Sequence, residues 1–140
     1  MSLPPVQVPL AAYVPARRAG DLLYLSGHVS RSDGAVVSGV VGDDVDPGFA
    51  RELARAVALD LLATAAAAAG SVDAVVGVVR LTVFVRSAPG FGGQPLVANG
   101  ASELLVELLG EPGRHARSAV GVSELPLGAA VEIDAVVEVR

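Results

Sequence analysis

The sequence predicts an α+β domain in which two helices cover one face of a mixed sheet. Strand-type runs of apolar and β-branched residues occupy both ends of the chain and its middle, and two segments with helical spacing separate them. The resulting order is β-β-α-β-α-β-β. Because residues 1–140 contain no repeat or linker, we expect them to form a single domain.

The first strands are expected between residues 16 and 45. An apolar run from Leu22 to Leu25 follows an Ala-Gly-Asp turn, and the turn residues Asp33 and Gly34 separate further extended pieces. This segment therefore predicts two or three strands.

The first helix is expected from residue 47 to residue 69. Asp46 is placed to cap it, Pro47 fits its first position, and Gly70 lies just past its end. The apolar residues that recur every four positions are Phe49, Leu53, Val57 and Leu61. This spacing predicts an amphipathic helix of about five or six turns.

The second half of the chain predicts one strand, one helix and two closing strands. The run "DAVVGVVRLTVFVRS" is almost continuously apolar, which is typical of a buried central strand covered on both faces. Leucines at helical spacing precede Gly110 and Pro112, although Asn99-Gly100 is unusual near the start of a helix. The uncovered face of the sheet is expected to be buried against other subunits.

Composition narrows the function classes. There is no Cys, which excludes disulfides and thiolate sites, and a net charge of −5 with 4% aromatics argues against nucleic acid as a partner. The 52% hydrophobic content favours a homo-oligomer. The most apolar window is rich in Ala and contains Asp60 and Asp73, so no membrane segment is expected. Since the N-terminus has no charged region before an apolar run, the expected compartment is the cytoplasm.

Charged residues near the C-terminus are the main candidates for a functional site. Arg114, His115 and Arg117 stand at the entrance of a strand, and Glu132 lies within the next apolar run. Arg117 could be a surface group, and Glu132 could pair with it or with a neighbouring subunit. His28 and His115 have no spaced carboxylate partner, so no metal site is expected. The glycine-rich loop "PGFGG" lacks the following Lys-Ser/Thr of a phosphate-binding loop.

Several motifs resemble the Rid family, also called the YjgF or endoribonuclease L-PSP family, whose members deaminate reactive imines and enamines. The matching stretches are "AYV", "GDLLYLSGHV", "VVRLTVFV", the helix with Asn99 and "ARSAVGVSELPLGAAVEIDAVV". They occur in the family's order and cover almost the whole chain. The resemblance implies a chorismate-mutase-like fold and a homotrimer with clefts between neighbouring subunits.

The resemblance also implies roles for individual residues, with no metal or organic cofactor. Arg117 matches the arginine that holds the carboxylate of a small metabolite, and Glu132 matches the acidic residue. The positions that match the substrate-binding part of the motif are Tyr13, Ser26, Gly27, Asn99 and Ala119.

The chemistry of these residues agrees with hydrolysis of a 2-iminoacid to a keto acid and ammonia. A guanidinium offers two parallel hydrogen bonds to a carboxylate and remains charged in a dry cleft. A carboxyl group whose pKa is raised by burial can deliver a proton to the leaving nitrogen. Arg117 and Glu132 are therefore the predicted catalytic residues.

Departures from the family pattern point to a divergent branch. Ala119 stands where many members have Cys, His28 replaces the usual Gln, and Arg114 and His115 adjoin the key arginine. His28, Arg114 and His115 are therefore candidates for altered specificity. Two other functions stay open: a non-catalytic sensor of carboxylate metabolites, and the ribonuclease in the family's name, against which the acidic composition argues.

Overall fold

The computed structural model describes residues 2–7 and 12–140. The strands are β1 (Ala16–Ala19), β2 (Leu22–Val29), β3 (Arg31–Ser32), β4 (Ala35–Val36), β5 (Val75–Arg86), β6 (Ala116–Val122) and β7 (Val131–Val139). The helices are α1 (Pro47–Ala69) and α2 (Gln94–Leu109), with short 3-10 turns at η1 (Val72–Ala74), η2 (Glu111–Gly113) and η3 (Pro126–Gly128). The expected α+β order is confirmed, and β3 and β4 form the additional hairpin at Asp33-Gly34.

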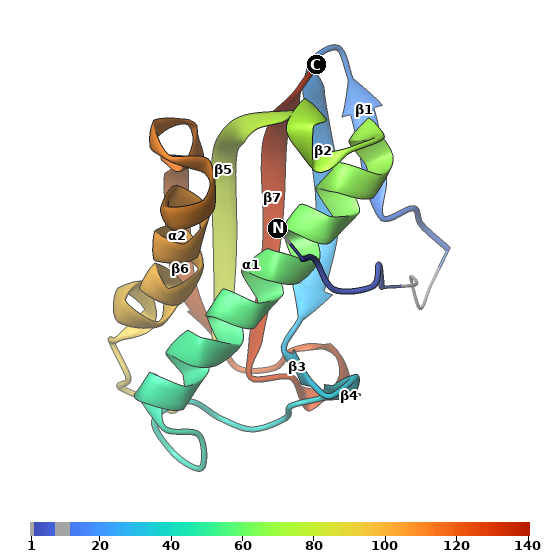
Figure 1. Cartoon of the computed structure of the whole chain (residues 1–140). Coiled ribbons are helices and arrows are strands. Elements are labelled where there is room, and N and C mark those ends of the chain that lie inside the picture. Colours follow the sequence, from blue (N-terminus) through green and yellow to red (C-terminus); the bar gives the residue numbers. More distant parts are fainter. Residues whose placement is uncertain (1, 8–11) are drawn as a thin grey trace.

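Five strands form one mixed sheet in the order β1-β2-β7-β5-β6. All neighbours are antiparallel except β5 and β6, which are parallel because α2 connects them. Both helices cover the same face, with α1 across the middle of the sheet and α2 beside it near β6 (Figure 1). The strand β6 is therefore at the sheet edge, close to α2.

The first helix has the predicted ends. The Asp46 carboxylate accepts a hydrogen bond from Gly48 N at 2.9 Å, and Gly70 adopts a left-handed conformation with a φ of 100°. Three members of the predicted apolar series, Leu53, Val57 and Leu61, are buried against the sheet. Phe49 is the exception, because its side chain in the first turn is 49% exposed.

The expectation that β5 is covered on both faces is wrong for a single chain. Leu81, Val83 and Val85 are buried beneath the helices, whereas the residues that alternate with them are exposed at Arg80 and only half-buried at Thr82 and Phe84. Alternation along a strand explains this difference, since the helices pack on one face only. The other face carries apolar side chains as well, and this is why the sequence pattern looked continuous. Within the residues that the structure describes, neither helix is both long and apolar enough to cross a membrane.

Candidate functional site

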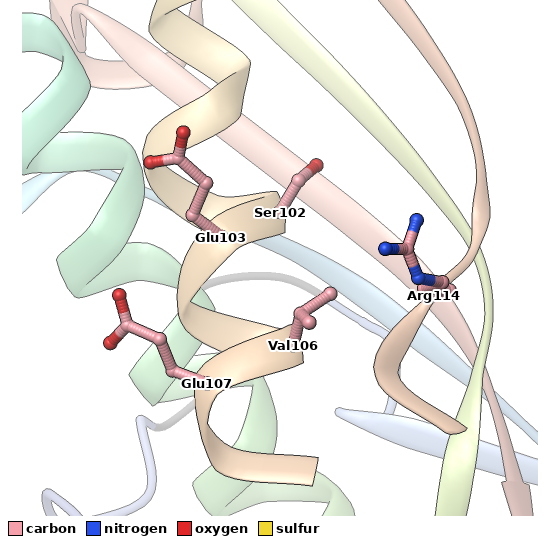
Figure 2. A pocket seen from close by; sticks show the side chains of 5 residues that line it. All are labelled: Ser102, Glu103, Val106, Glu107 and Arg114. Carbon is pink, nitrogen blue, oxygen red and sulfur yellow. The ribbon is translucent and has the colours of Figure 1, made fainter. Parts of the chain in front are cut away.

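A groove lies between α2 and the segment that leads into β6. Ser102, Val106 and Arg114 line both parts of this groove (Figure 2). Its smaller part, about 240 Å³, is also lined by His115 and Arg117. The side chains of the strand entrance that the sequence singled out therefore surround one shared hollow.

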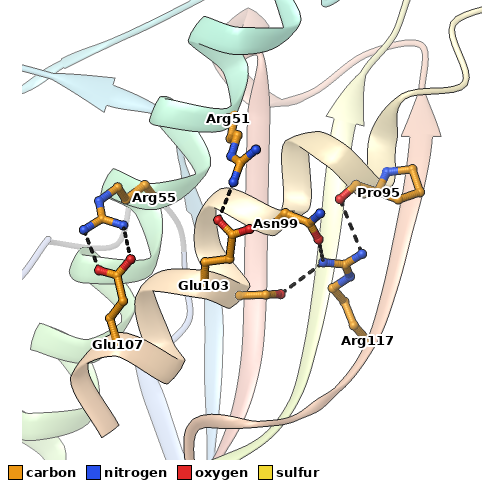
Figure 3. A network of polar contacts seen from close by, with 8 residues as sticks. Arg51, Arg55, Pro95, Asn99, Glu103, Glu107 and Arg117 are labelled. Atoms are coloured by element: carbon orange, nitrogen blue, oxygen red, sulfur yellow. Dashed lines mark hydrogen bonds and ion pairs between the residues drawn. The ribbon is translucent and has the colours of Figure 1, made fainter. Parts of the chain in front are cut away.

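The larger part of the groove, about 490 Å³, has acidic walls that are already paired. Glu103 of α2 pairs with Arg51 of α1, and Glu107 accepts from Arg55 Nη2 at 2.9 Å (Figure 3). These two ion pairs join the helices one turn apart. Both glutamates are thus paired, and the other polar side chains of the groove are the neutral and basic ones that line its smaller part.

Arg117 points from β6 toward α2. It pairs in register with the buried Leu81, so its side chain lies on the helix-covered face of the sheet. Its Nη1 donates to Asn99 Oδ1 at 2.9 Å and to Ser102 Oγ at 3.1 Å, and Nη2 makes a longer contact of 3.4 Å with the Pro95 carbonyl oxygen (Figure 3). Three residues of α2 therefore hold one guanidinium.

The contacts of Arg117 leave one edge of its guanidinium for a ligand. Both Nη1 protons are used, while the Nε proton has no acceptor within residues 2–7 and 12–140. Over the same residues, no carboxylate forms an ion pair with Arg117. Nε–H and a second Nη2–H lie on the same edge, in the arrangement that binds a carboxylate through two parallel hydrogen bonds.

His115 is held by both of its ring nitrogens. Nδ1 lies 2.7 Å from the Gly113 carbonyl oxygen, and Nε2 lies 2.8 Å from Ser102 Oγ. Because the carbonyl can only accept, Nδ1 carries a proton. Ser102 thus contacts both His115 and Arg117.

A second cluster of predicted site residues lies where the pairing of β2 with β7 becomes irregular. The register between β2 and β7 shifts between Leu25 and His28, which places a bulge at Ser26-Gly27. Ser26 Oγ donates to the Val14 carbonyl oxygen at 2.7 Å, and this bond holds the chain next to Tyr13 against the bulge. Tyr13 is 49% exposed.

Glu132 belongs to this second cluster. A Cβ at Gly27 would lie only 2.4 Å from Glu132 Oε2, so the carboxylate sits directly over a glycine backbone that leaves room for it. Burial, and then the negative charge of Asp134, raise the pKa of Glu132 above its ordinary value. A carboxyl group in this setting can hold a proton at higher pH than a solvated one.

One chain does not bring the two clusters together. Glu132 pairs with Phe84 of β5, while Arg117 pairs with Leu81, three residues away along the same strand. An odd offset places the two side chains on opposite faces of the sheet. Arg117 therefore lies under α2 on the covered face, and Glu132 lies on the open face. Within a single chain they form no pair.

The remaining candidates take different positions. Ala119 shares the covered face with Arg117, two residues along β6, and packs against the core. Arg114 is exposed and pairs with Glu111 at 3.1 Å while lining the groove.

His28 does not line either part of the groove. It is only 8% exposed, on the covered face of β2, with Nε2 lying 3.2 Å from Thr64 Oγ1 of α1. Burial, and then the charge of Arg31, lower its pKa. Its place beneath α1 argues against the predicted role in specificity.

Ser102 is the groove residue that sequence reasoning missed. It follows Asn99 by three positions, and residues with that spacing share one face of a helix. The signal was therefore present once Asn99 had been matched to the family's asparagine. A serine inside a leucine-rich helix gave no separate reason to single it out.

Known proteins resemble this chain over almost its whole length. The model of the family described as Endoribonuclease L-PSP matches residues 5–139. Protein TCP17 of Trypanosoma cruzi is 44% identical over 142 residues, covering 100% of this chain and 89% of that protein. A crystal structure of a protein with unknown function from Agrobacterium tumefaciens is 47% identical, with a TM-score of 0.89, and covers 95% of this chain and 86% of its own. RidA from an Antarctic Psychrobacter is 26% identical, with a TM-score of 0.65 and coverages of 96% and 94%.

Proposed function

The chain belongs to the endoribonuclease L-PSP family, and on that premise we propose that it hydrolyses imines and enamines derived from amino acids to keto acids and ammonia. The fold is the chorismate-mutase-like one expected from the resemblance. The observation that carries the proposal is Arg117, a guanidinium held by neutral oxygens of α2 with one edge left for a carboxylate. A 2-iminoacid presents such a carboxylate beside its C=N bond.

The reaction needs water and two proton transfers. The water oxygen bonds to the imine carbon and loses a proton, and the nitrogen gains one, which gives an aminoalcohol. A proton then passes from the new hydroxyl to the nitrogen, the C–N bond breaks, and ammonia leaves the keto acid. Arg117 holds the carboxylate and fixes the position of the imine carbon. Glu132 carries the protons, and its raised pKa suits that role.

The opposite positions of Arg117 and Glu132 lead to the second part of the proposal. We infer a homotrimer in which the open face of one subunit, with Tyr13, Ser26 and Glu132, meets the β6 edge of the next. The exposed apolar side chains on the open face, including Tyr24 and Val120, support burial against another copy. Each site then takes its guanidinium and its carboxyl group from different subunits.

The direct test generates 2-iminoacids in situ from several amino acids and follows the release of keto acid and ammonia. Arg117→Ala is expected to abolish acceleration. Arg117→Lys is expected to recover little, because an ammonium keeps the charge but not the two-pronged geometry. Equal rates for wild type and Arg117→Ala, or no acceleration with any iminoacid, would sink the catalytic proposal. Binding of keto acids without ammonia release would favour a metabolite sensor.

Mixed oligomers test whether sites are shared between subunits. Arg117→Ala and Glu132→Gln proteins are each expected to be inactive, and unfolding and refolding them together in equal amounts should restore about a quarter of wild-type activity, because random assembly makes that share of interfaces intact. A mixture that stays as inactive as its components, although its subunits have exchanged, contradicts the shared site. A monomer by sedimentation would do the same.

A further inference from the structure

A chain of hydrogen bonds stands behind Arg117. Arg117 Nη1 lies 3.1 Å from Ser102 Oγ, Ser102 Oγ lies 2.8 Å from His115 Nε2, and His115 Nδ1 lies 2.7 Å from the Gly113 carbonyl oxygen. The chain links α2, η2 and the entrance of β6. It ends on a backbone group, which cannot rotate.

The direction of each bond follows from what the groups can do. A guanidinium only donates, so Ser102 Oγ must accept from Arg117. The Gly113 carbonyl only accepts, so His115 Nδ1 donates, and the Nε2 of a neutral ring is left as an acceptor. The Ser102 proton is therefore directed to His115, and a lone pair of the hydroxyl is directed to Arg117.

This use of Ser102 is unusual for a serine inside a helix. Such a hydroxyl ordinarily turns back to a carbonyl of the preceding turn. Here His115 draws the proton away from the helix, and the oxygen becomes available to the guanidinium. Asn99 Oδ1 accepts the other Nη1 proton at 2.9 Å, so two acceptors fix the guanidinium plane.

We propose that Ser102 and His115 are positioning residues that set the orientation of Arg117 for carboxylate capture. The inference rests on the proposed function, because it assigns to Arg117 the binding of the substrate carboxylate. Without the pair, the guanidinium keeps its charge and its contact with Asn99 but can rotate about its last bonds. Loss of the pair should therefore weaken carboxylate binding by disturbing the orientation of Arg117, while the charge of the site stays the same.

Four variants separate positioning from a purely structural role. Ser102→Ala removes the acceptor, and Ser102→Thr restores a hydroxyl at the same place. His115→Leu removes the ring acceptor, whereas His115→Gln offers a side-chain oxygen to Ser102. The matched control is Ser71→Ala, an exposed serine whose side chain caps nothing.

The first readout needs no ligand. In ¹⁵N-labelled protein, the Nη signals of Arg117 are assigned by their loss in Arg117→Lys, and slow rotation should keep them resolved in the wild type. They should broaden in Ser102→Ala and His115→Leu and stay resolved in Ser102→Thr and Ser71→Ala. Thermal unfolding of each variant, measured in parallel, identifies any loss of signal that comes from unfolding.

The second readout is binding of pyruvate and 2-oxobutanoate, which carry the carboxylate without the reactive imine. Loss of one oriented hydrogen bond is expected to weaken binding about fivefold in Ser102→Ala. In turnover assays KM should rise by a similar factor, and kcat should change less. Ser102→Thr and His115→Gln should recover most of the affinity.

The outcomes distinguish the two proposals. Wild-type Nη signals and wild-type affinity in Ser102→Ala would overturn the positioning role, whatever the enzyme does with iminoacids. Resolved Nη signals that collapse in Ser102→Ala support it even if no iminoacid is hydrolysed. In that second case the proposed deamination would be wrong, whereas the proposal that Ser102 and His115 orient Arg117 would stand.

Discussion

Gly100→Ala tests whether the close approach of the two helices depends on the glycine that looked out of place in α2. An ideal Cβ at Gly100 would lie 2.0 Å from the Arg51 carbonyl oxygen and 2.9 Å from its carbonyl carbon. Both atoms belong to the backbone of α1, so no side-chain rotation can relieve the clash. The helices must move apart by roughly an ångström to accommodate one methyl group.

The magnitude follows from two opposing effects. Alanine improves helix propensity by about 1 kcal/mol relative to glycine in a helix interior. Overpacking a rigid contact costs up to about 3 kcal/mol, and a clash with backbone belongs at the upper end of that range. The net result should be a loss of about 2 kcal/mol in the free energy of unfolding, and helix separation also weakens the contact between Arg51 and Glu103.

The assay is thermal and urea unfolding of the purified protein, with Gly92→Ala as the matched control. A Cβ at Gly92 would meet nothing within 4 Å, and its φ lies outside the left-handed range. Gly92→Ala should therefore leave the Tm unchanged or slightly higher. If Gly100→Ala unfolds at or above the wild-type temperature, the gain in helix propensity exceeds the cost of the clash, and the inferred role of Gly100 in spacing the helices is wrong.

Three further predictions concern the scaffold. As pH falls below about 6.5, the wild type should lose stability faster than His28→Gln. The pKa of His28 is lowered in the folded state, so the unfolded chain binds the proton more strongly. This loss of stability should continue until the pH passes the folded-state pKa. Asp46→Ala should destabilise the protein by about 1 kcal/mol in urea unfolding, and Asp46→Asn by less, since both an amide and a carboxylate can cap α1. Glu107→Gln should leave the Tm almost unchanged at physiological salt, because its pair with Arg55 is exposed and screened.

Each of these has an outcome that contradicts it. Parallel pH–stability curves for wild type and His28→Gln would mean that the ring near Thr64 is protonated as easily in the folded state as in the unfolded chain. Equal stability of Asp46→Ala and wild type would remove the cap as a determinant of the α1 start. A large drop in Glu107→Gln would show that the two interhelical pairs act as a coupled network.

The sequence predicted elements well where the signals were local. The N-cap at Asp46, the left-handed glycine at position 70 and the Asp33-Gly34 turn each depend on a few adjacent residues, and all three are confirmed. Predictions that depended on distant packing fared less well. Phe49 continues the helical apolar series, but it lies in the first turn of α1 and is largely exposed.

The candidate site was only partly predictable for the same reason. Motif position was enough to select Asn99 and Arg117 separately, and the structure adds that they are hydrogen-bonded. The hydrogen bond between Ser102 and His115 could not be foreseen, because it joins α2 to a loop residue that lies 13 positions later in the sequence. The position of His28 beneath α1 could not be foreseen either, because the bulge before it changes which face its side chain occupies.

The opposite faces of Arg117 and Glu132 were likewise invisible in the sequence, since strand pairing decides them. This placement bears on how the proposed activity would depend on assembly. A lone chain holds the Arg117 guanidinium on the helix-covered face of the sheet and the Glu132 carboxyl group, the proposed proton carrier, on the other face. If the proposal holds, an isolated subunit could bind a keto acid weakly but could not hydrolyse an imine. Ligand affinity and turnover should then separate on dilution, with turnover lost at the concentration where the oligomer dissociates and Arg117-dependent binding partly retained.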